Sequence, residues 1–208
     1  MQIKQHLTYI TLSLRTCALK SYRTFVTMSV EVTLRKANQD DIPSIVKICA
    51  LSVAILNADN NFQWNDTYPL QSDFEMDIVD DVLWVAVVDH TVAGFAALTT
   101  DQAEEYTELG WKQEDISLVP HRVAVDPAFR GKGIARKFMV KAEELAREAG
   151  YKYLRVDTNI RNLAMQGLFK SLGYEYGGEV SFKNKPAIYE KMRFPCYQKV
   201  LVYGNEDA

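Results

Sequence analysis

The sequence predicts one α/β domain with a mixed central sheet flanked by helices. Val82–Val88 (VLWVAVV) is a continuous apolar run, typical of a strand buried on both faces. Arg130–Gly150 is a long amphipathic stretch that ends in a glycine, as helices commonly do. Strand candidates precede and follow each helical stretch, which favours an α/β sheet over a bundle or a sandwich. The length of 208 residues suits one domain.

The predicted elements follow in a clear order. Glu31–Arg35 alternates in polarity and predicts the first strand, and Asp40-Asp41 then precedes a helix whose apolar residues run from Ile42 to Val53. The polar stretches Asn57–Pro69 and Thr100–Leu118 are predicted loops. The other predicted strands are Val82–Val88, Val92–Thr99, His121–Val125, Tyr153–Thr158, Tyr174–Phe182 and Pro186–Arg193, and the later helices are Arg130–Gly150 and Asn162–Leu172.

The domain is expected to cover residues 30–195, with an N-terminal extension at 1–29 and a C-terminal tail at 196–208. The first thirty residues contain no Asp or Glu but carry Lys, Arg and many hydroxyl side chains. That composition fits an organellar transit peptide, or an extended start in which Met28 is the working N-terminus.

Composition and charge exclude several classes of function. A net charge of −3 gives no overall basic field for nucleic acid. The three cysteines lie far apart and match neither a disulfide framework nor a metal site, so a cytoplasmic location is the simplest expectation. Cys49 falls on the apolar face of a predicted helix and is expected to be a buried thiol. No apolar run approaches the roughly 18–20 residues of a membrane span, so no membrane partner is expected.

The segment Arg130–Ala135 (RGKGIA) lies between a predicted strand and the start of the long helix. Unpaired N–H groups and the helix dipole attract anions at such a position, and glycines let a phosphate approach the backbone. Arg130 and Lys132 add positive charge. These features together indicate a pyrophosphate site.

Three kinds of phosphate loop compete for this segment. A Walker loop requires GxxxxGK[ST], but the glycines here are too close together. A dinucleotide loop requires GxGxxG after the first strand, and Arg136 occupies the place of its third glycine. The third pattern, (Q/R)xxGx(G/A), matches Arg130–Ala135 at every position.

That third pattern is the cofactor loop of the GNAT (Gcn5-related) N-acetyltransferases. Val123–Ala135 (VAVDPAFRGKGIA) resembles the cofactor segment of this family, and Asn162–Tyr174 (NLAMQGLFKSLGY) resembles its second block, NxxAxxLYxxxGF. The resemblance extends from Glu31 to Arg193. The pattern of motifs is similar to that of uncharacterised bacterial members of the family. Two blocks in the correct order are much more specific than the loop alone.

The resemblance implies the GNAT acyl-CoA N-acyltransferase fold, in which two neighbouring parallel strands splay apart, here His121–Val125 and Tyr153–Thr158. It implies acetyl-CoA as acetyl donor, a primary amine of a small molecule or peptide as acceptor, direct attack through a tetrahedral intermediate, and often a homodimer. The pantetheine arm would lie between the splayed strands. The cofactor-binding residues implied are Val123, Ala124, Val125, Arg130, Gly131, Lys132, Gly133, Ile134, Ala135, Arg136, Asn162 and Phe169.

His121 is the candidate general base. A free alkyl ammonium has a pKa of about 10 and must lose a proton before it attacks, and histidine titrates nearest to neutral pH. Its position is similar to that of a histidine base in arylalkylamine acetyltransferases. In the alternative interpretation, His121 only makes a hydrogen bond within the sheet. The other candidate bases are Glu31, Asp66, Glu104, Glu105 and Asp157, and the candidate oxyanion donor is the Val123 N–H.

The sequence departs from the family at Phe169. The family commonly has a tyrosine there that protonates the leaving thiolate, and phenylalanine has no proton to donate. Tyr174, Tyr176, Tyr189 or a water could replace it, or the thiolate could leave unassisted, since a thiol pKa near 8.5 makes it a fair leaving group.

The acceptor site is expected in the aromatic loop Asn57–Pro69, where Trp64, Asp66 and Tyr68 could hold an amine. The same side chains could equally belong to a surface loop packed on the core. Two other functions stay open. The chain could be a non-catalytic acyl-CoA sensor, which Phe169 allows, or an unrelated enzyme that binds a nucleotide phosphate.

Overall fold

The computed structural model describes residues 31–183, 189 and 191–203, so the predicted N-terminal extension lies outside the described part. Seven strands form one sheet in the order β1-β2-β3-β4-β5-β7-β6. The strands are β1 Thr33–Lys36, β2 Leu83–Val88, β3 Thr91–Thr99, β4 Ser117–Val125, β5 Tyr153–Asp157, β6 Glu175–Val180 and β7 Phe194–Val200. The α-helices are α1 Ile42–Ala58, α2 Gln71–Val79, α3 Ile134–Glu148 and α4 Leu163–Ser171, and the 3-10 turns are η1 Gln39–Asp41, η2 Glu104–Leu109 and η3 Pro127–Phe129.

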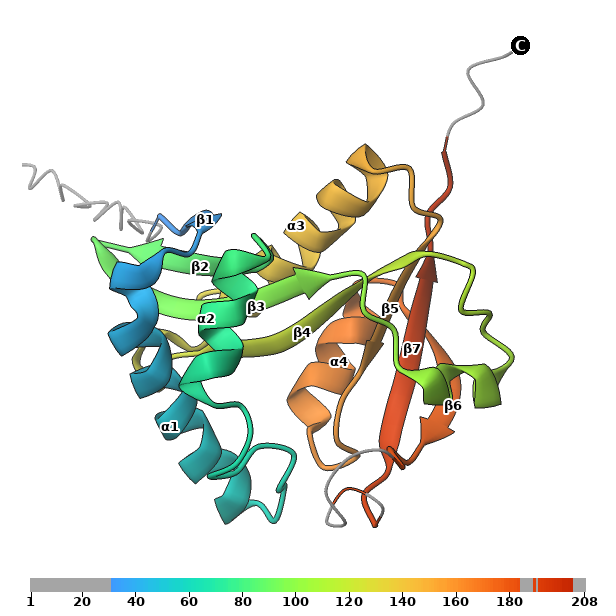
Figure 1. Ribbon diagram of the computed structural model, residues 1–208, viewed down its shortest axis with the longest axis horizontal. Helices are drawn as coiled ribbons and strands as arrows, with labels where there is room; N and C mark the ends of the chain where they lie inside the picture. Colours follow the sequence, from blue (N-terminus) through green and yellow to red (C-terminus); the bar gives the residue numbers. More distant parts are fainter. Residues whose placement is uncertain (1–30, 184–188, 190, 204–208) are drawn as a thin grey trace, which may run out of the picture.

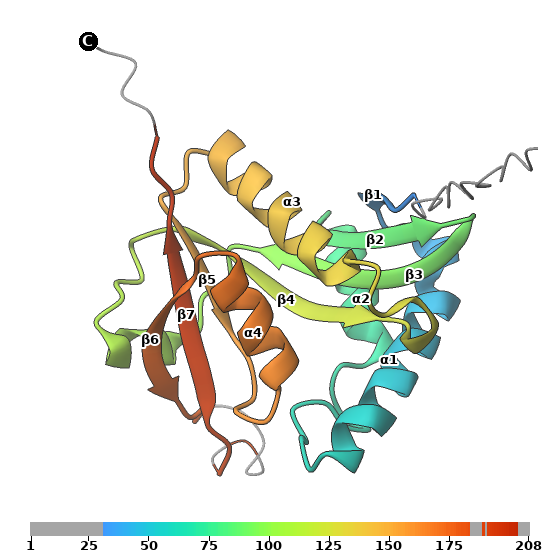
Figure 2. The ribbon, with the colours of Figure 1, turned by 180° about the vertical axis from the view of Figure 1, so that it is seen from behind.

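The helices cover the two faces of the sheet, with α1 and α2 on one face and α3 and α4 on the other (Figures 1 and 2). Helix α1 buries Ile45 and Ile48 against Phe95 and neighbouring residues of β2 and β3. By length and composition alone, Gln39–Ala58 could cross a membrane, which the expectation from the sequence missed. One face of this helix packs against the sheet, and 33% of the apolar window is buried.

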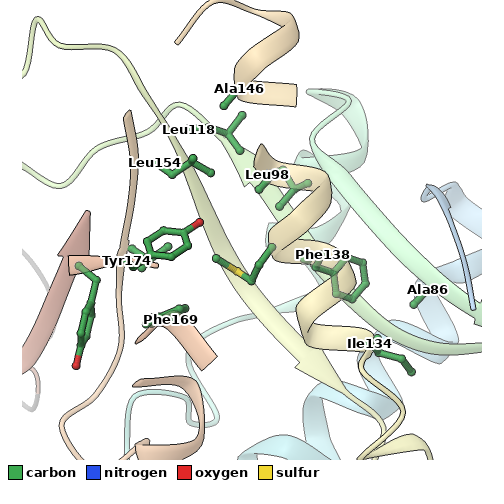
Figure 3. Close-up of a cluster of buried hydrophobic side chains, with 14 of the residues drawn as sticks. Ala86, Leu98, Leu118, Ile134, Phe138, Ala146, Leu154, Phe169 and Tyr174 are labelled. Carbon is green, nitrogen blue, oxygen red and sulfur yellow. The ribbon is translucent and has the colours of Figure 1, made fainter. Parts of the chain in front are cut away.

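The larger core lies under α3 and α4 (Figure 3). The 3.6-residue period of α3 turns Ile134, Phe138 and Ala146 toward the sheet, while its charged residues face outward. Phe169 of α4 closes the cluster from the side and packs against Tyr174, with ring centroids 5.9 Å apart. This core spans β4 and β5 and holds the two parts of the sheet together.

The sheet opens between β4 and β5, which are its parallel neighbours. They pair at only two positions, Ser117 with Tyr153 and Leu118 with Leu154, and then diverge. Pro120, two residues after Leu118, has no backbone N–H to offer. Further along, the register of β4 with β3 shifts between Ala124 and His121, which is a β-bulge. The predicted splayed pair of strands is therefore confirmed.

Several predicted boundaries were wrong. Helix α3 begins at Ile134 rather than Arg130, because Gly131 and Gly133 have φ values of 77° and 76°, which a right-handed helix cannot contain. Half of the strand predicted at Pro186–Arg193 lies outside the described residues, and the described part, Tyr189 and Lys191–Arg193, is not strand. The residues that enter the sheet are Phe194–Val200, so the predicted tail from 196 begins inside β7.

The thiols of Cys49 and Cys196 are buried, as expected for Cys49. Burial raises the pKa of Cys49 to about 11, and burial also raises the pKa of Cys196. At pH 8 only about one Cys49 in a thousand is thiolate, the reactive form. In a Cys17→Ser variant we expect no reaction of the native protein with an aromatic disulfide reagent, and two thiols after denaturation. Rapid reaction of the native protein would contradict the packing described.

Candidate active site

A cavity of about 1180 Å³ follows the opening between β4 and β5. It exceeds the roughly 300–1,000 Å³ of an ordinary small-molecule pocket, so it can hold a long ligand and a second molecule. One end reaches the loop before α3, and the other lies among the α1–α2 loop, the segment before η2 and the residues around Tyr189. The predicted cofactor residues line it, apart from Lys132: Val123, Ala124, Val125, Arg130, Gly131, Gly133, Ile134, Ala135, Arg136, Asn162 and Phe169.

The start of α3 forms an anion-binding end of this cavity. The first backbone hydrogen bond of the helix runs from Lys137 N to Gly133 O at 3.0 Å, so the three preceding amides lie before the helical ladder. The helix dipole adds about half a positive charge at this point. A Cβ at Gly131 or Gly133 would have no protein atom within 4 Å, which leaves room for a phosphate against the backbone. These residues fit the pyrophosphate of acetyl-CoA.

Gly133 offers a test with a matched control at the other end of the same helix. Gly133 and Gly150 both have positive φ, 76° and 72°, and a Cβ added to either would have no protein atom within 4 Å. Alanine at either site should cost about 1 kcal/mol of stability. We expect only Gly133→Ala to weaken acetyl-CoA binding in calorimetry, by about tenfold, because its methyl group occupies the phosphate position. Equal affinities in both variants would contradict this site.

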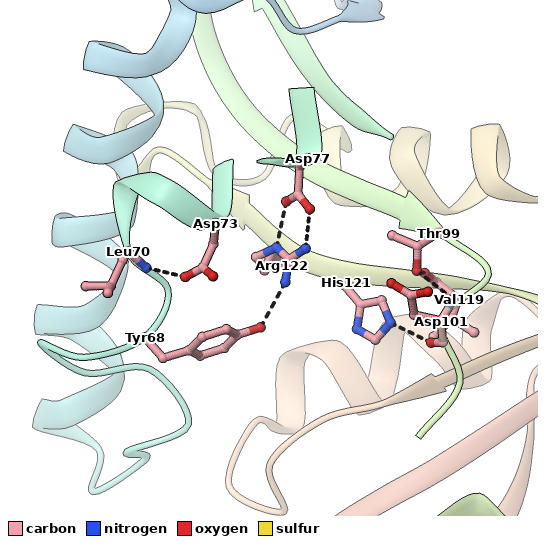
Figure 4. Close-up of polar contacts among 9 residues, drawn as sticks. All are labelled: Tyr68, Leu70, Asp73, Asp77, Thr99, Asp101, Val119, His121 and Arg122. Carbon is pink, nitrogen blue, oxygen red and sulfur yellow. Dashed lines mark hydrogen bonds and ion pairs between the residues drawn. The ribbon is translucent and has the colours of Figure 1, made fainter. Parts of the chain in front are cut away.

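Arg122 occupies the bulge of β4 with φ of 50°, a left-handed conformation that is uncommon outside glycine. Its guanidinium group donates two hydrogen bonds to the carboxylate of Asp77 on α2, and the Nε–Oδ2 distance is 2.8 Å (Figure 4). A third nitrogen donates to the Tyr68 hydroxyl at 3.1 Å. Both charged side chains are mostly buried, with 16% and 7% of their surface exposed. Arg122 therefore joins the bulge to α2 and to the predicted acceptor loop, Asn57–Pro69.

His121, the predicted base, lines the cavity beside this bulge. Its Nε2 lies 3.0 Å from the Asp101 carbonyl oxygen (Figure 4). A carbonyl oxygen only accepts hydrogen bonds, so in the neutral imidazole this contact favours the proton on Nε2 and the lone pair on Nδ1. The two interpretations of His121, a general base and a residue that makes a hydrogen bond within the protein, are therefore compatible. The hydrogen bond uses Nε2, and Nδ1 is the nitrogen that can take a proton.

Asp157 ends β5 and also lines the cavity. Its Oδ2 accepts a hydrogen bond of 2.7 Å from the hydroxyl of Tyr106, which is fully buried. Burial raises the pKa of Tyr106 well above its usual value, so this hydroxyl stays protonated and donates. The sequence named Asp157 among several candidate bases but gave no signal for Tyr106, which comes from the predicted loop after β3.

Gln63 connects the α1–α2 loop to the far side of the cavity. Its side-chain oxygen accepts from Asn159 N at 3.0 Å, and its backbone oxygen accepts from the Tyr189 hydroxyl at 2.5 Å. Segments far apart in the sequence thus close this end of the cavity. No local pattern predicts these contacts.

The candidate general acids differ in position. The buried hydroxyl of Tyr174 has no hydrogen-bond partner among the described residues. Tyr174 does not line the cavity, and burial raises its pKa. Tyr176 lies outside the cavity as well. Tyr189 does line it, but its hydroxyl donates to the Gln63 carbonyl, and burial raises its pKa to about 12. Phe169 lies at the cavity wall with 2% exposure and packs on Tyr197.

The three predicted acceptor residues occupy different positions relative to the cavity. Tyr68 lines the cavity and Trp64 borders it from the core, where Trp64 stacks on Phe95 with ring centroids 6.3 Å apart. Asp66 is exposed at the tip of a turn closed by the hydrogen bond from Asn65 N to Tyr68 O, and it does not line the cavity. The structure therefore does not bring Asp66 to the site. Lys132 of the loop before α3 is likewise not among the residues that line the cavity, although its Nζ lies 5.3 Å from the ring centroid of Phe129, which does line it.

The Asn162 side chain caps α4 by accepting from Met165 N at 3.3 Å. This cap uses the side-chain oxygen, so the amide nitrogen is the group that remains for a ligand. The predicted contact with the pantetheine arm stays a prediction.

Comparison with known proteins identifies the class of protein that this fold and cavity define. The model of the acetyltransferase (GNAT) family matches residues 53–174, more than half of the chain. The chain therefore belongs to the GNAT acetyltransferase family. Members of this family take the acetyl group from acetyl-CoA, and acetyl-CoA is accordingly the cofactor.

Particular relatives are more distant. N-acetylaspartate synthetase from Homo sapiens is 33% identical over 95 residues, 46% of this chain and 28% of the relative. The Xenopus tropicalis protein of that name is 30% identical over 105 residues, 50% of this chain and 35% of the relative. The chain thus spans about a third of the length of the curated relatives it matches.

Solved structures cover much more of the chain. A GNAT-family acetyltransferase from Streptococcus agalactiae is 27% identical, with a TM-score of 0.68, and the match covers 83% of this chain and 96% of that one. The yncA protein from Salmonella typhimurium, solved with its cofactor acetyl-CoA, is 19% identical with a TM-score of 0.60, over 83% and 95% of the two chains. At that identity the second likeness supports the fold alone.

Proposed function

We propose that this protein is an N-acetyltransferase that moves the acetyl group of acetyl-CoA to a primary amine of a small molecule or peptide. One observation carries the proposal. A single cavity connects the anion-binding start of α3 to His121 through the gap between β4 and β5. A pyrophosphate at the first end and an amine at the second would meet across this gap.

Each residue then has a role set by its position. The amides before α3, with Arg130 and Arg136, hold the pyrophosphate, and the free backbone edge of β4 around Val123 and Val125 holds the pantetheine arm. Bound acetyl-CoA supplies an activated carbonyl. His121 takes a proton from the acceptor ammonium through Nδ1, directly or through a water. The Val123 N–H donates to the negative charge that develops on the carbonyl oxygen.

Position 169 supplies no general acid, since Phe169 has no hydroxyl. A thiol with a pKa near 8.5 can leave as thiolate without a proton at neutral pH. The thiolate would then take its proton from water in the open part of the cavity.

The test is calorimetric titration of the full chain with acetyl-CoA, with ATP and NAD as controls, followed by an amine screen read out by free thiol. Saturable binding of acetyl-CoA alone, and thiol release with at least one amine, is the expected result. Binding without turnover over a broad amine panel would instead indicate an acyl-CoA sensor. Preference for ATP or NAD would contradict both.

A further inference from the structure

The carbonyl group that contacts His121 is part of the peptide group between Asp101 and Gln102. His121 Nε2 lies 3.0 Å from the Asp101 carbonyl oxygen, in the segment that follows β3 (Figure 4). The carbonyl of Asp101 and the backbone nitrogen of Gln102 lie in one rigid plane, as in every peptide bond. A constraint on Gln102 therefore also fixes the direction of the carbonyl that His121 contacts.

The side chain of Gln102 uses its full hydrogen-bonding capacity within the protein. Its Oε1 accepts from the Ser117 hydroxyl at 2.9 Å and from a guanidinium nitrogen of Arg155. Its Nε2 donates to the backbone oxygens of Gln113 and Asp115, at 3.2 and 3.1 Å. A side-chain amide has two N–H donors and two acceptor lone pairs, so all four positions are occupied. Rotation of this side chain would break several hydrogen bonds at once.

Arg155 of β5 is the rigid partner of Gln102. Only 1% of its side-chain surface is exposed. Its Nε donates to Gln198 Oε1 at 3.0 Å, and its Nη1 donates to Gln102 Oε1 and to the Lys112 carbonyl oxygen. The guanidinium carbon lies 5.3 Å from the ring centroid of Trp111. A buried guanidinium with these contacts has little freedom to move, so it fixes Gln102 to the central sheet.

Asp101 is also held from its other side. Its backbone N–H donates to Thr99 Oγ1 at 3.1 Å, and Thr99 is the last residue of β3. Gln102 is fixed to β5 through Arg155 and to β4 through Ser117. The Asp101 carbonyl thus lies between two anchored positions. Turning it away from the imidazole would require these hydrogen bonds to break.

The direction of the Asp101 carbonyl determines how the imidazole of His121 is presented to the cavity. The hydrogen bond made by one ring nitrogen sets which nitrogen carries the proton. It also limits rotation of the ring about its second side-chain torsion, which is otherwise broad. A base held in this way keeps its lone pair directed at one place. A misplacement of about 1 Å in a reacting group can cost roughly 100-fold in rate.

We propose that Gln102 is a positioning residue for the reaction: anchored by Arg155, it fixes the Asp101 carbonyl that orients the His121 base. This role rests on the acetyl transfer proposed above. Gln102 also lines the cavity, but its amide makes all four of its hydrogen bonds to the protein. It therefore acts through His121 and not as a ligand of the acceptor.

The test is a matched pair of variants of the full chain, Gln102→Met and Gln198→Met. Both replace the amide by a side chain of similar size, and both remove one acceptor from Arg155. Only Gln102 shares a peptide group with Asp101, whereas Gln198 lies opposite Arg155 on β7. We expect Gln102→Met to lower kcat roughly tenfold or more with unchanged acetyl-CoA affinity in calorimetry, and Gln198→Met to keep both close to wild type. The acceptor is the panel amine with the fastest thiol release.

Nuclear magnetic resonance of the full chain labelled with ¹⁵N-histidine, with coenzyme A present, observes the imidazole itself. The His121 Nε2–H signal is the one missing from His121→Ala. A hydrogen-bonded N–H exchanges slowly with water, so we expect the signal in the wild type and in Gln198→Met, and its loss by exchange in Gln102→Met. This readout needs no turnover. A wild type that shows the signal but releases no thiol would contradict the proposed reaction and not the anchored carbonyl.

A Gln102→Met variant that keeps both kcat and the His121 signal would overturn the proposal. Equal losses in the two methionine variants would also overturn it, since they would show only that Arg155 needs its acceptors. Ser117→Ala is a milder variant, which removes one of the two hydrogen bonds accepted by Gln102 Oε1. We expect it to lower kcat and the His121 signal in the same direction but by less. Absence of the signal in the folded wild type would contradict the anchor without any variant.

Discussion

His121→Ala should lower kcat by roughly 100- to 10,000-fold, the usual contribution of a general base, while acetyl-CoA binds as before. The contact of Nε2 with the Asp101 carbonyl leaves Nδ1 as the proton acceptor, and alanine removes it. The acceptor must then lose its proton to solvent. Steady-state kinetics with a saturating amine, together with calorimetry for acetyl-CoA, separates the loss of catalysis from a loss of binding.

The pH profile of the variant provides a sharper readout. Without a base, the residual rate should rise with pH toward the amine pKa of about 10, because only the neutral amine attacks. His90→Asn is the control, since His90 lies in the β2–β3 turn with φ of 62°, a conformation that asparagine also adopts. An unchanged kcat in His121→Ala would remove His121 from the mechanism.

Asp77→Ala should lower the free energy of unfolding by about 3 kcal/mol, because it leaves the Arg122 guanidinium buried without a counter-charge. This figure is the low end of the range for buried pairs, since Arg122 keeps 16% exposure. The pair also joins α2 to the bulge of β4 and, through Tyr68, to the acceptor loop. Urea unfolding monitored by circular dichroism measures the change.

Asp80→Ala is the control for this substitution, since Asp80 is exposed at the end of the same helix. We expect it to change stability by no more than about 0.5 kcal/mol. A loss below about 1 kcal/mol in Asp77→Ala would show that water reaches Arg122 and replaces the carboxylate.

The cofactor half of the site could be predicted from the sequence because its chemistry is local. Gly131 and Gly133 lie two positions apart in the turn before α3, and both have positive φ values, which glycine adopts readily. The apolar period of α3 and the uniform apolar run of β2 are likewise properties of short segments. Such patterns predict a helix or a strand without knowledge of the elements that pack against it.

The acceptor half could not be predicted because its contacts join distant segments. Tyr106 and Asp157 are 51 positions apart, and Gln63 and Tyr189 are 126 apart. Helix α2 buries only Phe74 and Asp77, too few to give a helical period, and Arg122 looks like any residue of an alternating strand. Pro120 lies within β4 and pairs with Leu98 of β3, whereas the pairing of β4 with β5 ends at Leu118. The sequence around Pro120 does not show where β5 diverges.

The short junction of β4 with β5 has a thermodynamic consequence. Two register pairs hold the strands together, and beyond them the backbone edge of β4 has a polar surface that a bound pantetheine arm would cover in the proposed enzyme. A ligand that fits the gap between β4 and β5 binds the folded chain and not the unfolded one. Mass action then raises the free energy of unfolding by about 2.7 kcal/mol at a hundred times Kd. The melting temperature of the protein would therefore follow the concentration of acetyl-CoA around it.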